Sequence, residues 1–200
     1  MIRRLIFICT TLSISFSALI KPDNNDNINY THVLFEWAQI EGAHSYQLQI
    51  ASDSNFTNIL TNTINESLIY IEKNIIDWNS QYHWRIRALD ENSIEFGDWL
   101  SATFSTAEKR ADAEATILSS NEVQDGLTIF SSFFDYFSAI IDKNGTEIWN
   151  TGNTDLVYYM NDTYGQFYGT QFSANDAELP GLKFSIDNEI LWSETGDSYV

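Results

Sequence analysis

The chain has 200 residues, 44% of them hydrophobic and 14% aromatic, and its 28 acidic and 10 basic residues give a formal charge of −18. This hydrophobic content is sufficient for packed cores, which excludes a wholly disordered chain. The negative charge repels phosphate backbones and anionic lipid headgroups, so we expect no nucleic-acid partner and no binding to a membrane surface. Plentiful Tyr, Phe, Trp, Ile and Thr, without long Ala/Leu/Glu/Lys stretches, predict an all-β protein.

The amino terminus has the pattern of a secretory signal. Arg3 and Arg4 precede an apolar run that extends over residues 5–20, and small residues lead to an expected cleavage near Ala18. The run is shorter than the roughly 20 residues that span a bilayer, and Thr and Ser interrupt it. We therefore predict a signal peptide at residues 1–18 and a secreted chain (periplasmic, cell-surface or extracellular) that is not inserted in a membrane after cleavage.

Cys9 is the only cysteine of the chain, and it lies inside the predicted signal peptide. Cleavage would leave a chain without cysteine. We therefore expect neither a disulfide, nor a thiolate metal site, nor a cysteine nucleophile in the secreted protein.

Residues 19–29 are polar and rich in Asn and Asp, which predicts a linker. Beyond it, apolar and mostly polar residues alternate with period two at residues 33–37, 46–50 and 82–88, as half-buried antiparallel strands require. Turn-forming Gly, Asp, Asn and Ser separate these runs. Several short strands with turns between them predict a β-sandwich.

A bacterial fibronectin type III domain is similar to three segments of this region, FEWAQIEGAHSYQLQIASDSNF, QYHWRIRALD and GDWLSATFST. In this resemblance Trp37 is the buried tryptophan of the second strand, Tyr46 opens the third strand, and Tyr82 is the tyrosine of the corner before the penultimate strand. Residues 99–106 correspond to the last strand. The resemblance implies a fibronectin type III-like domain over residues 30–107, and modules of this kind in bacterial secreted enzymes usually act as spacers.

The three histidines of the chain, His32, His44 and His83, all lie in this first region. No HxxxH or HxH pair occurs, and we expect His83 to face away from the core. We therefore predict no metal site.

Arg85 and Arg87 share the outer face of one predicted strand. We expect both guanidinium groups to stack on Trp99 as cation–π neighbours. We interpret this cluster as a structural ladder rather than a ligand site.

Residues 108–125 are charged at their start and lack strand alternation, which predicts a second linker. Residues 126–200 are again all β. The predicted strand runs are residues 127–134, 138–142, 147–149, 156–160, 166–172, 182–186 and 190–192.

This second region repeats itself. Residues 137–149 (FSAIIDKNGTEIW) and 182–192 (LKFSIDNEILW) each have an apolar strand that reaches Ile-Asp, a tight turn, and a second strand that ends in tryptophan. Asp142 and Asp187 are 45 residues apart and are expected to be equivalent. A period of 40 to 50 residues with several short strands per unit is typical of propeller blades.

Two explanations apply to Asp142. Its carboxylate can accept hydrogen bonds from the amides of a hairpin turn in which Asn144 and Gly145 tolerate positive φ. Alternatively, D-x-N-G resembles the start of an EF-hand calcium loop, but that loop needs glycine at position six and glutamate at position twelve. Here glycine is at position four and Asn153 is at position twelve, so we favour the hairpin.

The segments DGLTIF, SAIIDKNGTEIW and GLKFSIDNEILW resemble the opening of the six-bladed propeller of the arylsulfotransferase family, although other propellers, such as quinoprotein-like ones, contain the same phrase. The expected fold is therefore an all-β chain with a fibronectin type III-like β-sandwich followed by an incomplete β-propeller of one to two blades. The resemblance also implies an enzyme that transfers sulfuryl groups between phenols through a transiently sulfated histidine.

This chain departs from the family at the residue that would do the chemistry. Residues 108–200 contain no histidine, and their only basic residues are Lys109, Arg110, Lys143 and Lys183. We therefore expect no catalytic residue, cofactor or metal site in this chain. One or two blades leave open strand edges, which favours a fragment: the non-catalytic amino-terminal portion of a longer protein, whose substrate would be a phenolic sulfate.

A second hypothesis stays open beside this one. The chain is then a secreted or cell-surface adhesion or binding protein, which uses the fibronectin-like module and a propeller-like β domain to recognise a protein or glycan ligand. Histidines beside strand ends further along the protein would favour the enzyme, and further fibronectin-like modules without them would favour adhesion.

Overall fold

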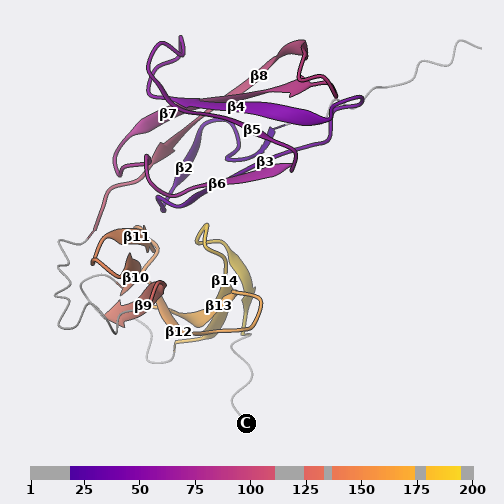
Figure 1. Ribbon diagram of the computed structural model, residues 1–200. Helices are drawn as coiled ribbons and strands as arrows, with labels where there is room; N and C mark the ends of the chain where they lie inside the picture. Colours follow the sequence, from indigo (N-terminus) through magenta and orange to yellow (C-terminus); the bar gives the residue numbers. More distant parts are fainter. Residues whose placement is uncertain (1–18, 111–123, 133–136, 174–178, 195–200) are drawn as a thin grey trace, which may run out of the picture.

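The computed structural model describes residues 19–110, 124–132, 137–173 and 179–194 (Figure 1). The predicted signal peptide at residues 1–18 and most of the predicted linker at 108–125 lie outside the described residues. The described part of the chain contains fifteen strands in four sheets and no helix, which confirms the all-β prediction. A search of the same residues for a helix long and apolar enough to cross a membrane finds none.

The first region, residues 19–107, contains two sheets that form two layers (Figure 1). A three-stranded sheet has the order β1-β3-β6, and a five-stranded sheet has the order β2-β8-β7-β4-β5. The arrangement is that of a β-sandwich. The strands are β1 (Leu19–Lys21), β2 (Asp26–Ile28), β3 (Val33–Trp37), β4 (Ser45–Ala51), β5 (Ile59–Asn65), β6 (Ile69–Glu72), β7 (Gln81–Leu89) and β8 (Glu95–Thr106).

Aromatic side chains from both sheets fill the space between the layers. The ring of Phe35 on β3 lies 5.1 Å from that of Trp84 on β7, edge to face, and 5.7 Å from that of Phe104 on β8. Trp37 packs in the same way on Tyr46, at 5.6 Å. Such pairs add to the burial of large apolar surfaces, so the alternation along β3, β4 and β7 is converted into one continuous core.

Residues 19–29 are not only a linker. Leu19 and Ile28 are buried, which fixes β1 beside β3 and β2 beside β8. The polar composition of the segment reflects the turn between these strands, where the carboxylate of Asp26 accepts the amide of Asp23 at 2.7 Å. Two buried apolar side chains are therefore enough to place short edge strands in a segment whose average composition predicts none.

The second region contains a three-stranded sheet with the order β11-β10-β9 and a four-stranded sheet with the order β12-β13-β14-β15. All pairs are antiparallel and consecutive along the chain. The strands are β9 (Leu127–Ser132), β10 (Phe137–Asp142), β11 (Glu147–Asn150), β12 (Leu156–Asn161), β13 (Phe167–Gln171), β14 (Gly181–Phe184) and β15 (Ile190–Ser193). Each predicted run of this region overlaps one of these strands.

The two sheets of the second region are joined through a buried serine. The hydroxyl of Ser138 on β10 donates to the carbonyl of Leu156 at 3.0 Å and accepts the amide of Tyr158 at 2.7 Å, both on β12. This pair of bonds satisfies backbone groups that would otherwise be unpaired at the start of the four-stranded sheet. Trp149, Phe167 and Phe184 then pack together beneath it, with ring centroids 5.2 and 5.6 Å apart.

Candidate functional site

The three histidines do not form a site. They lie on different elements: His32 precedes β3, His44 precedes β4, and His83 is on β7, where its neighbours Tyr82 and Trp84 point into the core. Burial and the nearby Lys73 lower the pKa of His32, which disfavours its charged form. Among the described residues, no group of three or more His, Cys, Asp or Glu side chains is placed to hold a metal ion.

Asp142 forms the hairpin turn that was favoured over a calcium loop. Its Oδ1 accepts the amides of Asn144 and Thr146, each at 2.8 Å, and Gly145 has a φ of 84°. Burial raises the pKa of Asp142, but the hydrogen bonds from these amides together lower it by more, so the net pKa is below its usual value. The carboxylate is occupied by the backbone and closes the β10–β11 turn.

The same turn occurs at four other places among the described residues. In each, a side-chain oxygen accepts the amides two and four residues later, and the residue three positions later has positive φ, as in a hairpin with a glycine-type bulge. The first residues of the five turns are Asp53, Asp90, Asp142, Asp162 and Ser185, and the residues with positive φ are Phe56, Ser93, Gly145, Gly165 and Asn188.

The predicted equivalence of Asp142 and Asp187 is therefore wrong by two positions. Ser185 occupies the place of Asp142 in the second repeat, since its hydroxyl accepts the amides of Asp187 and Glu189 at 3.2 Å. Asp142 and Ser185 are 43 residues apart, the same spacing as Trp149 and Trp192. The Ile-Asp pair occupies different positions in the two turns. In the second turn serine replaces aspartate as the acceptor, so the carboxylate of Asp187 is not used in the turn.

Asp187 instead connects the two regions. Its carboxylate accepts the hydroxyl of Tyr30 at 2.8 Å and pairs with the ammonium of Lys21 at 3.0 Å. Burial, and then the charge of Asp187, raise the pKa of the Tyr30 phenol. The hydrogen bond to Asp187 raises the pKa of Lys21. These directions mean that the neutral phenol and the charged ammonium are both favoured at the junction.

A backbone bridge lies beside this contact. Tyr30 pairs antiparallel with Trp149 on β11, the amide of Thr31 donates to the carbonyl of Ile148 at 2.9 Å, and the amide of Asn150 donates to the carbonyl of Asn29 at 3.1 Å. The first region therefore continues the sheet of the second by a short additional pairing. Buried residues of both regions belong to one continuous hydrophobic cluster.

Glu147 is the most deeply placed charged residue of this junction, with none of its surface exposed. Its carboxylate accepts the amide of Arg110 at 3.1 Å and the side-chain amide of Asn150 at 2.7 Å. Its carbonyl accepts the indole N–H of Trp78, from the first region, at 2.9 Å. Tyr30, Trp78 and Glu147 were not singled out in the sequence, and Asp187 was singled out only as a turn residue. A glutamate at the start of an otherwise apolar strand was the one available signal of the junction.

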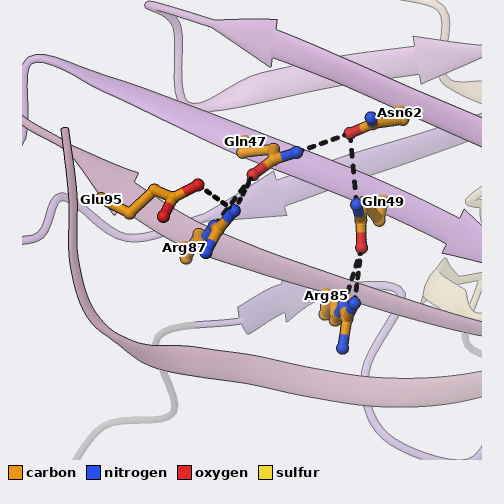
Figure 2. Close-up of polar contacts among 6 residues, drawn as sticks. All are labelled: Gln47, Gln49, Asn62, Arg85, Arg87 and Glu95. Atoms are coloured by element: carbon orange, nitrogen blue, oxygen red, sulfur yellow. Dashed lines mark hydrogen bonds and ion pairs between the residues drawn. The ribbon is translucent and has the colours of Figure 1, made fainter. Parts of the chain in front are cut away.

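The predicted arginine ladder is present on the outer face of the five-stranded sheet. The guanidinium carbon of Arg85 lies 4.1 Å from the centre of the Trp99 ring, and that of Arg87 lies 4.4 Å from it. The guanidinium carbon of Arg85 also lies 3.9 Å from the centre of the Phe56 ring, which the sequence did not indicate. Figure 2 shows how the two arginines bond to Gln47 and Gln49, the residues opposite them on β4.

Comparison with protein-family models and with curated proteins finds no match to this chain. The junction and the ladder are therefore interpreted from their own chemistry.

Proposed function

We propose that this chain is the non-catalytic amino-terminal portion of a secreted arylsulfotransferase-like protein, in which a fibronectin type III-like sandwich is fixed to the opening blades of a β-propeller. The observation that carries the proposal is the junction at Tyr30 and Trp149. A sandwich that acts only as a spacer needs a linker, whereas this one shares backbone hydrogen bonds and the contact between Tyr30 and Asp187 with its neighbour.

The second region supports the propeller part of the proposal through its topology. A propeller blade is a four-stranded antiparallel sheet whose strands follow one another, and β12 to β15 have this order. The two hairpins that share the repeat, β10–β11 and β14–β15, lie in successive sheets, as equivalent strands of successive blades would.

The absence of histidine after His83 supports a non-catalytic role. Sulfuryl transfer through a sulfated imidazole needs a histidine and cationic groups around the sulfuryl oxygens. The guanidinium carbon of Arg110 lies 5.9 Å from the centre of the Phe137 ring, and Lys143 is paired with Asp125 at the surface. The sandwich and the first blades would therefore position a catalytic centre that lies elsewhere in the protein.

Two measurements test this function. The purified chain, incubated with 4-nitrophenyl sulfate and phenol, should give neither nitrophenol nor a sulfated protein, and steady turnover would contradict the proposal. Hydrogen exchange should be slow at the amides of Thr31 and Asn150, which cross the junction. Trp78→Phe, which removes the donor to Glu147, should speed exchange at both amides, whereas Trp99→Phe on the outer face should not. Rapid exchange in the unmodified chain would show that the two regions are merely tethered.

A further inference from the structure

Arg85 has no carboxylate partner among the described residues, in a chain with nearly three times as many acidic as basic residues. Three ion pairs between described residues join Lys21 to Asp187, Arg87 to Glu95 and Lys143 to Asp125. Arg85 is instead held by a neutral amide: its Nε and Nη2 donate to Oε1 of Gln49 at 2.9 and 2.7 Å. Its positive charge is therefore not neutralised by the contact that orients it.

The orientation of Arg85 leaves part of the guanidinium available. The rings of Phe56 and Trp99 have their centres 3.9 and 4.1 Å from its guanidinium carbon, and Gln49 occupies the edge formed by Nε and Nη2. Gln49 is itself fixed by Asn62, whose side-chain oxygen accepts from it at 3.3 Å. Figure 2 shows a nitrogen of Arg85 that points away from Gln49. The second edge, formed by Nη1 and the outer N–H of Nη2, is thus a preoriented pair of donors of the geometry that binds carboxylate or sulfate bidentately.

A hollow of about 230 Å³ lies beside this arginine. Besides Arg85, its lining supplies further side chains that can donate hydrogen bonds. Among the described residues, only that of Thr103 already donates one. The polar residues of the lining are Asn24, Ser54, His83, Arg85, Ser101 and Thr103. At about 30 Å³ per water molecule, the space is that of a small group rather than of a large ligand.

We propose that this hollow, which we name the Arg85 hollow, binds a single oxyanion group, a carboxylate or a sulfate, carried by an acidic ligand. The guanidinium edge of Arg85 binds two of the oxygens, and the side chains of His83 and Ser101, on the neighbouring strands β7 and β8, donate to the remainder. The site is separate from the junction and does not rest on the proposed function. It gives the outer face of the sandwich a recognition role in addition to the structural role of the arginine ladder.

The overall negative charge of the chain opposes this binding only weakly. At physiological ionic strength exposed charges more than about 8 Å apart are largely screened, so the local charge dominates. Asp53, next to Ser54 in the chain, is occupied by the amides of Asn55, Thr57 and Asn58. Binding of an isolated anion is therefore expected in the millimolar range, which is typical of one charge-assisted contact at a surface.

Titration of the intact chain with sodium sulfate, sodium acetate and sodium chloride at constant ionic strength tests the proposal. The side-chain Nε–Hε resonance of Arg85 and the amide resonance of Ser101 should shift saturably with sulfate or with acetate. The anion that binds more tightly identifies the oxyanion group that the hollow prefers. Chloride should give only small linear changes. Shifts that do not saturate with either oxyanion, or that chloride reproduces, would overturn the proposal.

Three variants, each with its amide spectrum recorded first, complete the test. Arg85→Gln should weaken binding at least about tenfold, the loss of one charged hydrogen-bonding group. Gln49→Glu keeps the arginine but neutralises its charge, so binding should weaken several-fold. This variant keeps the proposal testable if Arg85→Gln does not fold. Lys143→Gln removes the same charge from a paired lysine and should leave binding unchanged. Unchanged binding in Gln49→Glu, or equal losses in all three variants, would show that Arg85 is not the site.

Discussion

The two regions of this molecule solve the same problem of β-sheet burial differently. In the first region two sheets cover each other, and β3 and β7 alternate between buried and partly exposed side chains. In the second region the outermost strand β15 has every residue exposed, with Trp192 at 55%, while its neighbour β14 buries Leu182 and Phe184. The difference shows that the two sheets of the sandwich bury each other's apolar faces. In the second region, by contrast, the buried side chains lie on the inner strands and at the junction.

The largest effect should separate the regions by a matched pair of core substitutions. Leu48 on β4 and Leu156 on β12 are both fully buried, so Leu48→Ala and Leu156→Ala should each cost about 2–5 kcal/mol of unfolding free energy. Because the two sheets of the sandwich bury each other's apolar faces, Leu156→Ala should unfold the second region while the amides of β7 stay protected from exchange. Leu48→Ala should lower the urea midpoint of both regions. Residue-resolved NMR during urea unfolding checks this, and equal midpoints for β7 and β13 in Leu156→Ala would contradict the comparison.

A smaller effect concerns the junction at alkaline pH. The pKa of the Tyr30 phenol is raised by folding, so the unfolded chain loses this proton first, near pH 10, and stability falls as the pH rises beyond that value. The slope from one such group is up to about 1.4 kcal/mol per pH unit. Lys21, whose pKa is also raised, contributes in the same direction.

Tyr30→Phe should therefore flatten the alkaline decline in stability, measured by urea unfolding between pH 9 and pH 11. Tyr158→Phe is the matched control, because its hydroxyl bonds only locally to Asn161. An identical alkaline slope in the parent chain and in Tyr30→Phe would show that the junction tyrosine does not stay protonated in the folded state.

The smallest effect concerns the shared hairpin turn. Asp142→Ala removes a carboxylate that accepts two amides and should cost about 1 kcal/mol, similar to the loss of a helix cap. Asp142→Asn keeps an acceptor and should lose less. The net pKa of Asp142 is lowered, so its contribution is present above about pH 4 and fades as the pH falls below that of the unfolded carboxyl. Thermal melts at pH 7 and pH 3 measure it, and an Asp142→Ala effect larger at pH 3 than at pH 7 would refute this reading of the turn.

Strands with buried alternate residues were predictable from the sequence, and β5 shows why others were not. Along β5 the side chains of Thr61 and Thr63 face inward, while Ile64 is 59% exposed at the sheet edge. The inward threonine Thr61 donates to Glu72 at 2.9 Å, so a polar contact replaces the expected apolar one. Alternation of apolar and polar residues predicts burial only where one face of the strand is shielded from water, and an edge strand does not meet that condition.

The arginine ladder was predictable because its members lie two residues apart on one strand, with Trp99 on the last strand of the same predicted sandwich. The junction was not, because its contacts join residues far apart in the sequence. Tyr30 and Asp187 are separated by 157 residues, and Trp78 and Glu147 by 69. Each of these side chains has an ordinary local explanation, in a strand end or a turn. Only the folded chain shows that they meet.

The central claim is that the first and second regions are held together by the junction and move as one body. Backbone ¹⁵N relaxation measures this most directly, by comparing the rotational correlation time from amides of β4 and β7 with that from β10 and β13. The account predicts one common correlation time, appropriate to a particle of 22.9 kDa. Two shorter and different values, one for each region, would contradict it.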